Sequence, residues 1–240
     1  MRIVAMVPAR LGSKRIKNKN LRLLDGKPLV FHVIDKAKKA AVFNDIYINS
    51  ESEIFAEIAK ELKVKFYKRS HEFASNDATN DMFVYDFFKN TDCDIMIQIN
   101  PTSPLYTQED IKNFVNTMLD NDYDAMHGVK EERIEAILCG KPLNFDIFKQ
   151  MPRSQDLEPV LLHAGGLMGW KKSRFCENMK KYNSGTYGCA GKIGYFKLTG
   201  FSKIDIDNED DFVLAELAIQ AKAKRGYFKK KYYKPKNIGK

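Results

Sequence analysis

Two stretches of this 240-residue sequence carry side chains suited to phosphate chemistry. The first, PARLGSKRIKNKN (residues 8–20), combines a glycine and a serine with closely spaced cations and no acid. Its cations are Arg10, Lys14, Arg15, Lys17 and Lys19. Like charges held together repel unless an anion lies between them, and backbone amides with Arg and Lys side chains suit a polyphosphate. The loop is therefore predicted to cradle phosphates, the alternative being an ordinary solvated basic loop.

Asp205 and Asp207 define the second stretch, KIDIDNEDD (residues 203–211). On a strand, a spacing of two directs both carboxylates to one face. Together with phosphate oxygens they suit Mg²⁺, which prefers hard oxygen ligands, and a bound metal helps a hydroxyl attack phosphorus. The alternative is that Asp207 or Asn208 caps a following helix, whose dipole the next acids complement. We favour the metal for Asp205 and Asp207, because crowded acids repel unless some meet a cation.

The elements that must position these residues alternate between strand-like and helix-like patterns. Strands are expected at residues 2–8, 45–49, 64–68, 94–100, 122–129 and 192–198. Helices are expected at residues 27–40, 53–62, 81–90, 106–120 and within 203–224. Thr107 and Asp110 have the spacing of a capping box. The alternation predicts an α/β fold with a mostly parallel sheet and helices on both faces. Its ligand crevice should lie beyond the carboxyl ends of the strands, where the basic loop also lies.

Two segments depart from this pattern. Residues 131–170 contain extended apolar pieces without a clear helix, so we expect an inserted arm there, within a domain of residues 1–221. Residues 222–240 form a basic tail with nine basic residues and no acid. The whole chain has 40 basic and 31 acidic residues, so its net charge of +9 belongs to the tail and the remainder is neutral. This distribution argues against nucleic acid as a partner.

The composition is that of a globular protein, with 44% apolar residues. No apolar run approaches the ~18 residues that a membrane span needs, and the start of the chain lacks the cleavage pattern of a secretory signal. The four cysteines have no paired spacing, which is typical of reduced thiols. We therefore expect a cytoplasmic protein without a membrane span.

Six stretches, taken in order, resemble the CMP-sialic acid synthetase family of acylneuraminate cytidylyltransferases, which activate nonulosonic acids. They span nearly the whole body of the chain and are PARLGSKRIKNKN, YINSESEIFAEIAKE, KRSHEFASNDATN, QINPTSPL, PRSQDLEP and KIDIDNEDDFVLAE. The resemblance implies a three-layer, Rossmann-like nucleotidyltransferase fold, with residues 131–170 as an arm through which a homodimer forms.

The implied activity is an Mg²⁺-dependent transfer of CMP from CTP to the anomeric hydroxyl of a sialic-acid-like 2-keto sugar acid, with release of pyrophosphate. A second interpretation keeps CTP but changes the acceptor to 3-deoxy-octulosonate or a polyol phosphate. A third is a non-enzymatic protein that binds RNA or an anionic surface through the basic tail, whose lysines alternate with aromatic residues.

The resemblance also implies roles for individual residues. Those that would hold the triphosphate are Arg10, Ser13, Lys14, Lys19 and Asn20. Those at the cytosine base are Arg69, Ala78 and Thr79. Those facing the sugar are Asn100, Ser103, Arg153 and Gln155. The metal would be bound by Asp205 and Asp207, and the catalytic residues would be Arg10, Lys14, Lys19 and Asp207.

Three of these residues bear on specificity. Arg69 can donate to the O2 and N3 acceptors that together mark cytosine, although a surface arginine beside Lys68 is the alternative. Arg153 suits a substrate carboxylate through a bidentate contact. Asn100 stands where sialate-activating members usually have glutamine, so the resemblance leaves the identity of the sugar open.

Overall fold

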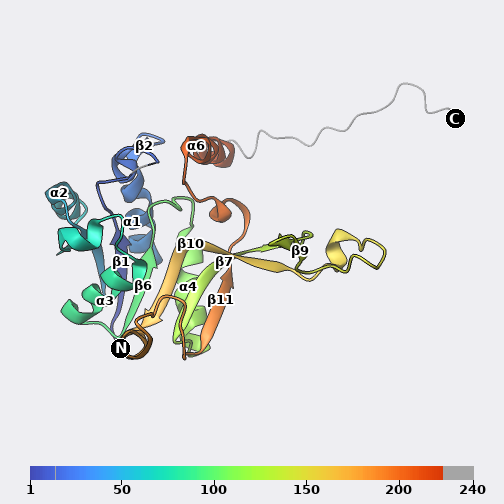
Figure 1. The fold of residues 1–240 in the computed structure, drawn as a ribbon. Coiled ribbons are helices and arrows are strands. Elements are labelled where there is room, and N and C mark those ends of the chain that lie inside the picture. Colours follow the sequence, from blue (N-terminus) through green and yellow to red (C-terminus); the bar gives the residue numbers. More distant parts are fainter. Residues whose placement is uncertain (14, 224–240) are drawn as a thin grey trace, which may run out of the picture.

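A seven-stranded sheet forms the centre of the protein, described here from a computed structural model that covers residues 1–13 and 15–223 (Figure 1). Its strands are β1 (Ile3–Pro8), β4 (Asp45–Ser50), β5 (Lys65–Lys68), β6 (Ile95–Ile99), β7 (Ala125–Glu132), β10 (Val160–Lys171) and β11 (Ile193–Lys197). Their order is β11-β7-β10-β6-β1-β4-β5. Only β10 runs antiparallel to its neighbours within this described sheet.

Helices cover both faces of the sheet. They are α1 (Leu29–Ala40), α2 (Glu53–Glu61), α3 (Asn80–Asn90), α4 (Gln108–Asp120), α5 (Lys172–Tyr182) and α6 (Glu209–Ala223). Short 3-10 turns lie at η1 (Lys19–Leu21), η2 (His71–Ala74), η3 (Ser154–Asp156) and η4 (Gly200–Lys203). Two small hairpins complete the fold, β2 (Leu23–Leu24) with β3 (Lys27–Pro28), and β8 (Ile137–Leu138) with β9 (Lys141–Pro142).

The side chains of β1 point alternately to the two faces of the sheet, which shows how the three layers form. Ala5 and Val7 belong to the core shared with α1, α2 and α4, whereas Val4 and Met6 belong to the core shared with α3 and α5. Both faces are buried, so the strand sequence is continuously apolar, as parallel strands covered on both sides usually are. The predicted α/β fold, with a mostly parallel sheet and helices on both faces, is confirmed.

The prediction of an arm over residues 131–170 is wrong at its C-terminal end. The second half of β10, Leu167–Lys171, pairs with β6 inside the central sheet. Its sequence hides this because Gly169 occupies a position where an apolar side chain is expected; a Cβ there would lie 2.7 Å from Ile97 Cδ1 and 2.9 Å from Met118 Sδ. Helix α5, which follows directly, was not predicted either.

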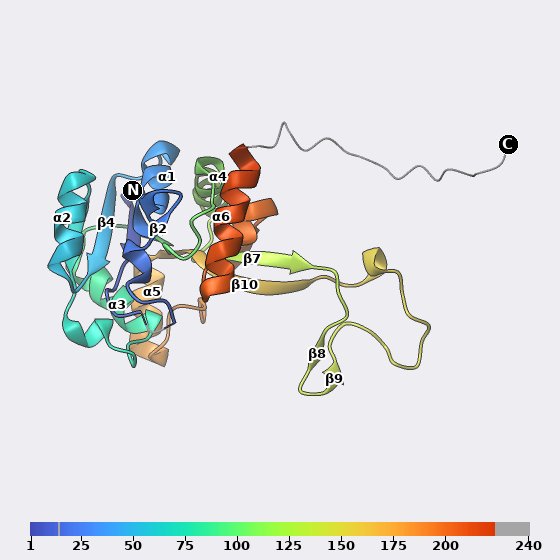
Figure 2. The same cartoon turned by 90° about the horizontal axis from the view of Figure 1, so that it is seen from above.

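The rest of that segment does leave the body. Beyond β7, the chain forms an extended projection that carries β8, β9 and η3 and returns along the first half of β10 (Figure 2). Helix α6 continues to Ala223, so the first two residues of the predicted tail are helical, and the others, 224–240, lie outside the described residues. In the part of the chain that the structure covers, no helix is both long and apolar enough to cross a membrane.

His127, in the middle of β7, is an unusual core residue. It is 1% exposed, and neither ring nitrogen has a hydrogen-bond partner among the described residues. Its ring lies 4.6 Å from that of His163 and near Trp170, measured between centroids. Burial, and next the neighbouring His163, lower the pKa of His127 to about 4. The folded protein therefore keeps this imidazole neutral at pH values where the unfolded chain protonates it.

We predict that His127 makes folding stability depend on pH below its ordinary pKa of about 6.5. Above pH 6.5 both states hold the neutral ring, and as the pH falls towards 4 only the unfolded state binds the proton, so stability is lost in that window. His127→Leu should remove about 2 kcal/mol of the loss measured between pH 8 and pH 5 by urea unfolding. The exposed His71, changed to Gln, is the control and should leave the wild-type pH dependence; an unaltered dependence in His127→Leu would contradict the assignment.

Candidate nucleotide-binding site

A cavity of about 520 Å³ lies beyond the carboxyl ends of β1 and β6. Pro8 ends β1, Asn100 and Pro101 follow β6, Arg69 follows β5, and Asp207 precedes α6. Because parallel strands end at the same edge of the sheet, loops far apart in sequence meet here. The cavity thus lies where the sequence predicts the ligand crevice.

The basic loop forms one wall of this cavity. Arg10, Arg15 and Lys19 all line it. Lys19 is 8% exposed, and its Nζ donates to the carbonyl oxygen of Ile206 at 2.7 Å. Burial lowers the pKa of Lys19, while Asp207 and Asp205 oppose the shift. A buried ammonium of this kind needs anionic or carbonyl partners, and it has them from the other end of the chain.

The two predicted aspartates form the facing wall. Asp207 Oδ1 lies 2.8 Å from Arg15 Nη2 and 3.8 Å from Lys19 Nζ. Asp205 Oδ1 accepts a hydrogen bond of 2.8 Å from Ser103 Oγ. The expectation that they lie on a strand is wrong, since this segment is extended but unpaired between η4 and α6. Both nevertheless line the cavity, and the intervening Ile206 is fully buried.

Capping of α6 is performed by the residues that follow. Asn208 Oδ1 accepts from the backbone nitrogen of Asp211 at 3.0 Å, and Asp211 Oδ2 accepts in return from the backbone nitrogen of Asn208 at 3.0 Å. The same carboxylate accepts from the backbone nitrogen of Asp207 at 2.8 Å. The carboxylates of Asp205 and Asp207 are thus left facing the cavity.

Arg69 forms a third wall and is buried, with 3% exposure, which excludes the alternative of a surface arginine. Its Nη2 lies 3.6 Å from Glu51 Oε2, and its guanidinium carbon lies 5.2 Å from the centroid of the Phe83 ring. Burial lowers the pKa of Arg69, against the effect of Glu51. Glu51 Oε1 also accepts from the backbone nitrogen of Leu11 at 2.8 Å. Glu51, which was not predicted, therefore joins Arg69 to the basic loop.

The remaining wall consists of neutral amides and backbone. Gln98 Nε2 donates to Asn80 Oδ1 and to Asn100 Oδ1, each at 2.9 Å. Asn100 Nδ2 donates in turn to the carbonyl oxygen of Gly165 at 2.6 Å. Next to it, a Cβ on Gly166 would collide with Ser103 Oγ and Tyr106 Oη, so the backbone can approach this wall closely only with glycine there. Of these wall residues, only Asn100 and Ser103 were predicted from the sequence.

The structure brings most of the predicted site residues together. Those lining the cavity are Arg10, Ser13, Lys19, Asn20, Arg69, Asn100, Asp205 and Asp207. Ser103 lies behind the wall, 1% exposed, and Ala78 and Thr79 precede the lining residues Asn80 and Phe83. Thr79 instead caps α3, since its Oγ1 accepts from the backbone nitrogen of Met82 at 3.4 Å. Lys14 lies outside the described residues.

Arg153 and Gln155 do not line the cavity of their own chain. They lie on the projecting arm, where Arg153 Nε pairs with Asp156 Oδ2 at 2.7 Å and remains largely exposed. A contribution to this cavity from either residue would therefore have to come from another copy of the chain.

The sequence model of the cytidylyltransferase family matches residues 4–162 of this chain. The chain belongs to the cytidylyltransferase family. The match includes the basic loop, Glu51, Arg69 and the amide wall up to Asn100. It ends before Asp205 and Asp207, which the fold brings to the same cavity.

Individual relatives agree with the family. The chain is 26% identical over 247 residues to the N-acylneuraminate cytidylyltransferase of Streptococcus agalactiae serotype III (strain NEM316), covering 97% of this chain and 58% of the relative. It is 35% identical over 121 residues to the CMP-N,N'-diacetyllegionaminic acid synthase of Legionella pneumophila, covering 48% of this chain and 52% of the relative. The chain thus spans little more than half the length of the Streptococcus relative, and the match to the Legionella synthase covers about half of each protein.

A solved structure shares the fold. The chain superposes on a CMP:2-keto-3-deoxy-manno-octonic acid synthetase complexed with CTP, with a TM-score of 0.69 and 15% sequence identity. The superposition covers 92% of this chain and 100% of the other. It confirms the predicted Rossmann-like nucleotidyltransferase architecture.

We predict that Glu51 stabilises the fold through its contacts with Arg69 and Leu11. Glu51→Gln keeps an acceptor for Leu11 but leaves the buried Arg69 cation without its carboxylate, which should lower the free energy of unfolding by about 3 kcal/mol. Glu53→Gln is the matched control, because Glu53 pairs with Lys68 on the surface and should change stability by less than ~1 kcal/mol. Urea denaturation of both variants checks this, and equal effects would show that the Glu51 pair contributes no more than a surface pair.

Proposed function

We propose that this cytidylyltransferase transfers CMP from CTP to the anomeric hydroxyl of a nonulosonic, sialic-acid-like 2-keto sugar acid and releases pyrophosphate. The observation that carries the proposal is one cavity with Arg10, Arg15 and Lys19 on one wall and Asp205 and Asp207 on the other. Cations suit a triphosphate, and facing carboxylates suit the metal that usually accompanies one. The similarity to an N-acylneuraminate cytidylyltransferase and to a CMP-N,N'-diacetyllegionaminic acid synthase supports this acceptor class.

In the proposed reaction, the acceptor hydroxyl attacks the α-phosphorus of CTP, and the bond from that phosphorus to the bridging oxygen breaks. Negative charge then develops on the departing pyrophosphate. Arg10 and Lys19 are placed to neutralise it, since Lys19 is held by Ile206 and Arg10 Nη1 is held by the carbonyl oxygen of Ser75 at 3.2 Å. Fixed cations of this kind stabilise a phosphoryl-transfer transition state without having to reorganise.

Arg69 is the proposed contact for the base. Arg69 and Phe83 both line the cavity and lie against each other, so they can offer a guanidinium donor and an aromatic ring to a cytosine. Because Glu51 connects Arg69 to Leu11, the proposed base pocket and phosphate loop are held in one relative position.

Mg²⁺ is the proposed cofactor, with Asp205 and Asp207 as its protein ligands. Two carboxylates fit this ion if the nucleotide supplies further oxygens, because Mg²⁺ commonly binds through one or two carboxylates, substrate phosphates and water. When bound, the ion would lower the pKa of the acceptor hydroxyl and screen the phosphate charge. Ser103 orients Asp205 through its hydrogen bond of 2.8 Å.

A panel of acceptors with CTP tests the proposed function. We expect pyrophosphate release with at least one of sialic, legionaminic, pseudaminic and 3-deoxy-octulosonic acids in the presence of Mg²⁺, and a fall of roughly 100-fold or more in kcat/KM for Asp207→Asn. Asp210→Asn, in the first turn of α6, is the control and should stay near wild type. Release only with 3-deoxy-octulosonate or a polyol phosphate would favour the second acceptor class.

The absence of pyrophosphate release with every acceptor would overturn the proposal. If, in addition, removing residues 224–240 abolished binding to RNA or anionic vesicles while Asp207→Asn had no effect, the chain would act through its tail.

We further propose a cytoplasmic location, since the four cysteines are free, as is usual in a reducing compartment.

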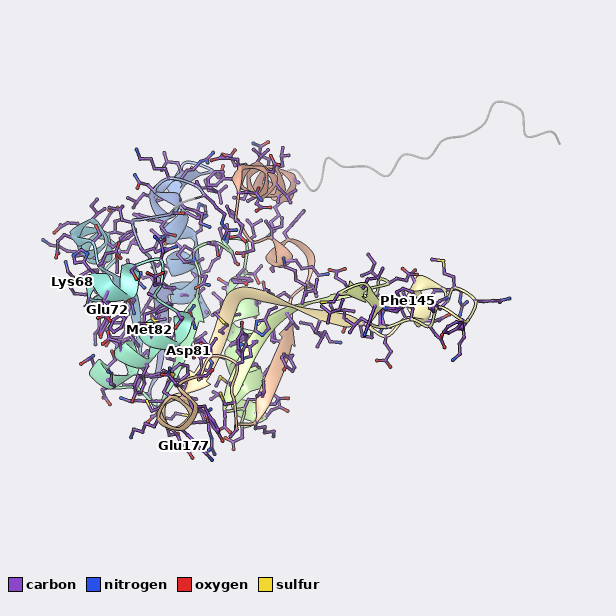
Figure 3. All side chains as sticks on the ribbon, in the orientation of Figure 1. Lys68, Glu72, Asp81, Met82, Phe145 and Glu177 are labelled. Carbon is purple, nitrogen blue, oxygen red and sulfur yellow. The ribbon has the colours of Figure 1, made fainter. Side chains whose placement is uncertain are left out.

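We also propose that the enzyme is a homodimer formed through its arm. The arm exposes large apolar side chains that one chain leaves uncovered, including Phe148 at 92%, Met151 at 81% and Ile137 at 67%. Figure 3 shows Phe145 on this arm, well away from the body of its own chain. Apolar clusters of this kind usually mark an interface. A partner's arm would also bring Arg153 to a cavity that it does not reach in its own chain.

The dimer is tested by sedimentation of the whole chain. Wild type should sediment as a dimer, and Ile137→Asp/Phe148→Asp as a monomer, because two buried charges would face apolar surface. Leu217→Asp is the matched control, since Leu217 is 56% exposed on α6. A monomeric wild type, or a dimer that survives the double substitution, would contradict the arm as the interface.

A further inference from the structure

A second cavity, of about 390 Å³, lies between α1, α6 and the start of α4. It shares no lining residue with the nucleotide cavity. Four lysines from three parts of the chain line it, namely Lys27, Lys36, Lys39 and Lys222. Asp25 is the only carboxylate among its described lining residues. A concave surface with this balance of charge attracts anions.

Lys36 is the central cation of this cavity. It is partly buried on α1, and its Nζ donates to the carbonyl oxygen of Pro104. Burial first, and then the charge of Lys222, lower the pKa of Lys36 to about 8, while Asp110 and Asp35 oppose the shift. The ammonium group of Lys36 is thus held in place, and the nearby acids neutralise its positive charge only in part.

The nearby acids are largely committed to other donors. Asp110 Oδ2 accepts from the backbone nitrogen of Thr107 and from Thr107 Oγ1, each at 2.8 Å, and from Ser202 Oγ at 2.7 Å. Asp35 lies 3.8 Å from Lys27 Nζ. Their charge is therefore shared with these partners, and the lysines keep a positive excess.

The backbone adds to this excess. Helix α4 has 13 residues and begins at the cavity, where Thr107 and Gln108 are lining residues. The N-terminus of a helix carries partial positive charge, although in α4 the capping box already engages the backbone nitrogens of Thr107 and Asp110. On the opposite side, Lys222 Nζ lies 3.4 Å from the carbonyl oxygen of Leu105. Lysine ammonium groups and the helix terminus thus converge on one space.

We propose that this cavity is a second anion site, which binds a small phosphate-type oxyanion between Lys36, Lys39, Lys222 and the N-terminus of α4. The site is independent of the proposed transfer reaction. It adjoins the segment that leads from Ser103 to Tyr106, and Tyr106, which lines it, also lies beside Gly166 next to the amide wall of the first cavity.

Titration calorimetry with inorganic phosphate at constant ionic strength tests the proposal. Arg10→Met is used as the background, because it weakens phosphate binding in the nucleotide cavity. We expect the second site to bind phosphate in this background as it does in the wild type, with its affinity weakened at least 10-fold by adding Lys36→Met and retained with Lys36→Arg. Lys38→Met is the matched control; it removes the same charge from α1, but Lys38 points to the carbonyl oxygen of Leu62 and should leave the affinity unchanged.

A second variant keeps the test decisive if Lys36→Met unfolds. Lys39→Gln/Lys222→Gln changes two exposed lysines, leaves the bond from Lys36 to Pro104 intact, and should also weaken phosphate binding at least 10-fold. Equal affinities in the cavity variants and in Lys38→Met, or no phosphate binding in the Arg10→Met background, would overturn the second site. None of these results depends on whether CTP is turned over.

Discussion

The contact between Lys19 and the segment before α6 holds together the cavity that we propose binds the nucleotide. Lys19 and Ile206 are 187 positions apart, yet the buried ammonium donates to that carbonyl oxygen and faces Asp207. A cation removed from water is costly without such partners. The basic loop can therefore bury Lys19 only when the end of the domain has docked, and this requirement fixes the two cavity walls relative to each other.

The same contact places opposite charges where a nucleotide would separate them. Arg15 and Lys19 both face Asp207 Oδ1. In the proposed reaction, a triphosphate competes with Asp207 for these cations and leaves the carboxylate available for a metal. Before substrate binds, these ion pairs keep the charged side chains of both walls in place. In the proposed reaction, the triphosphate replaces Asp207 as the partner of the cations, and the metal replaces the cations as the partner of Asp207. This also reconciles these cations with a stable fold, since Arg10, Arg15 and Lys19 each have a partner within the chain.

Local patterns predicted the scaffold well, and contacts between distant side chains much less well. Apolar periodicity located β1, α1 and most of the sheet, and the spacing of Thr107 and Asp110 gave a capping box that the structure contains. The charged site residues were found because charge density is visible in sequence. Glu51 and Gln98 were missed, since a glutamate beside a helix start and a glutamine within a strand gain meaning only from Arg69 and Asn80, which folding brings to them. The half of β10 that lies in the central sheet was missed because its glycines interrupt the apolar pattern of a buried strand. These glycines are explained by close packing, for example of Gly169 against Ile97 in β6.

The neutral wall of the cavity bears on the proposed acceptor. Asn80, Gln98 and Asn100 occupy each other's amide groups, and Gly165 offers only a carbonyl oxygen, so this wall holds no cation among its described residues. A 2-keto sugar acid carries a carboxylate, which needs a positive partner when it leaves water. Arg10, Arg15 and Lys19 are engaged by the proposed triphosphate on the opposite wall. Arg153, exposed on the arm near Gln155, is one of the cations that the arm carries, and it could serve this carboxylate only from a second chain. The proposed substrate and the proposed dimer therefore support each other: an acceptor carboxylate calls for a cation, and the arm carries an exposed one that a partner chain would bring to this cavity.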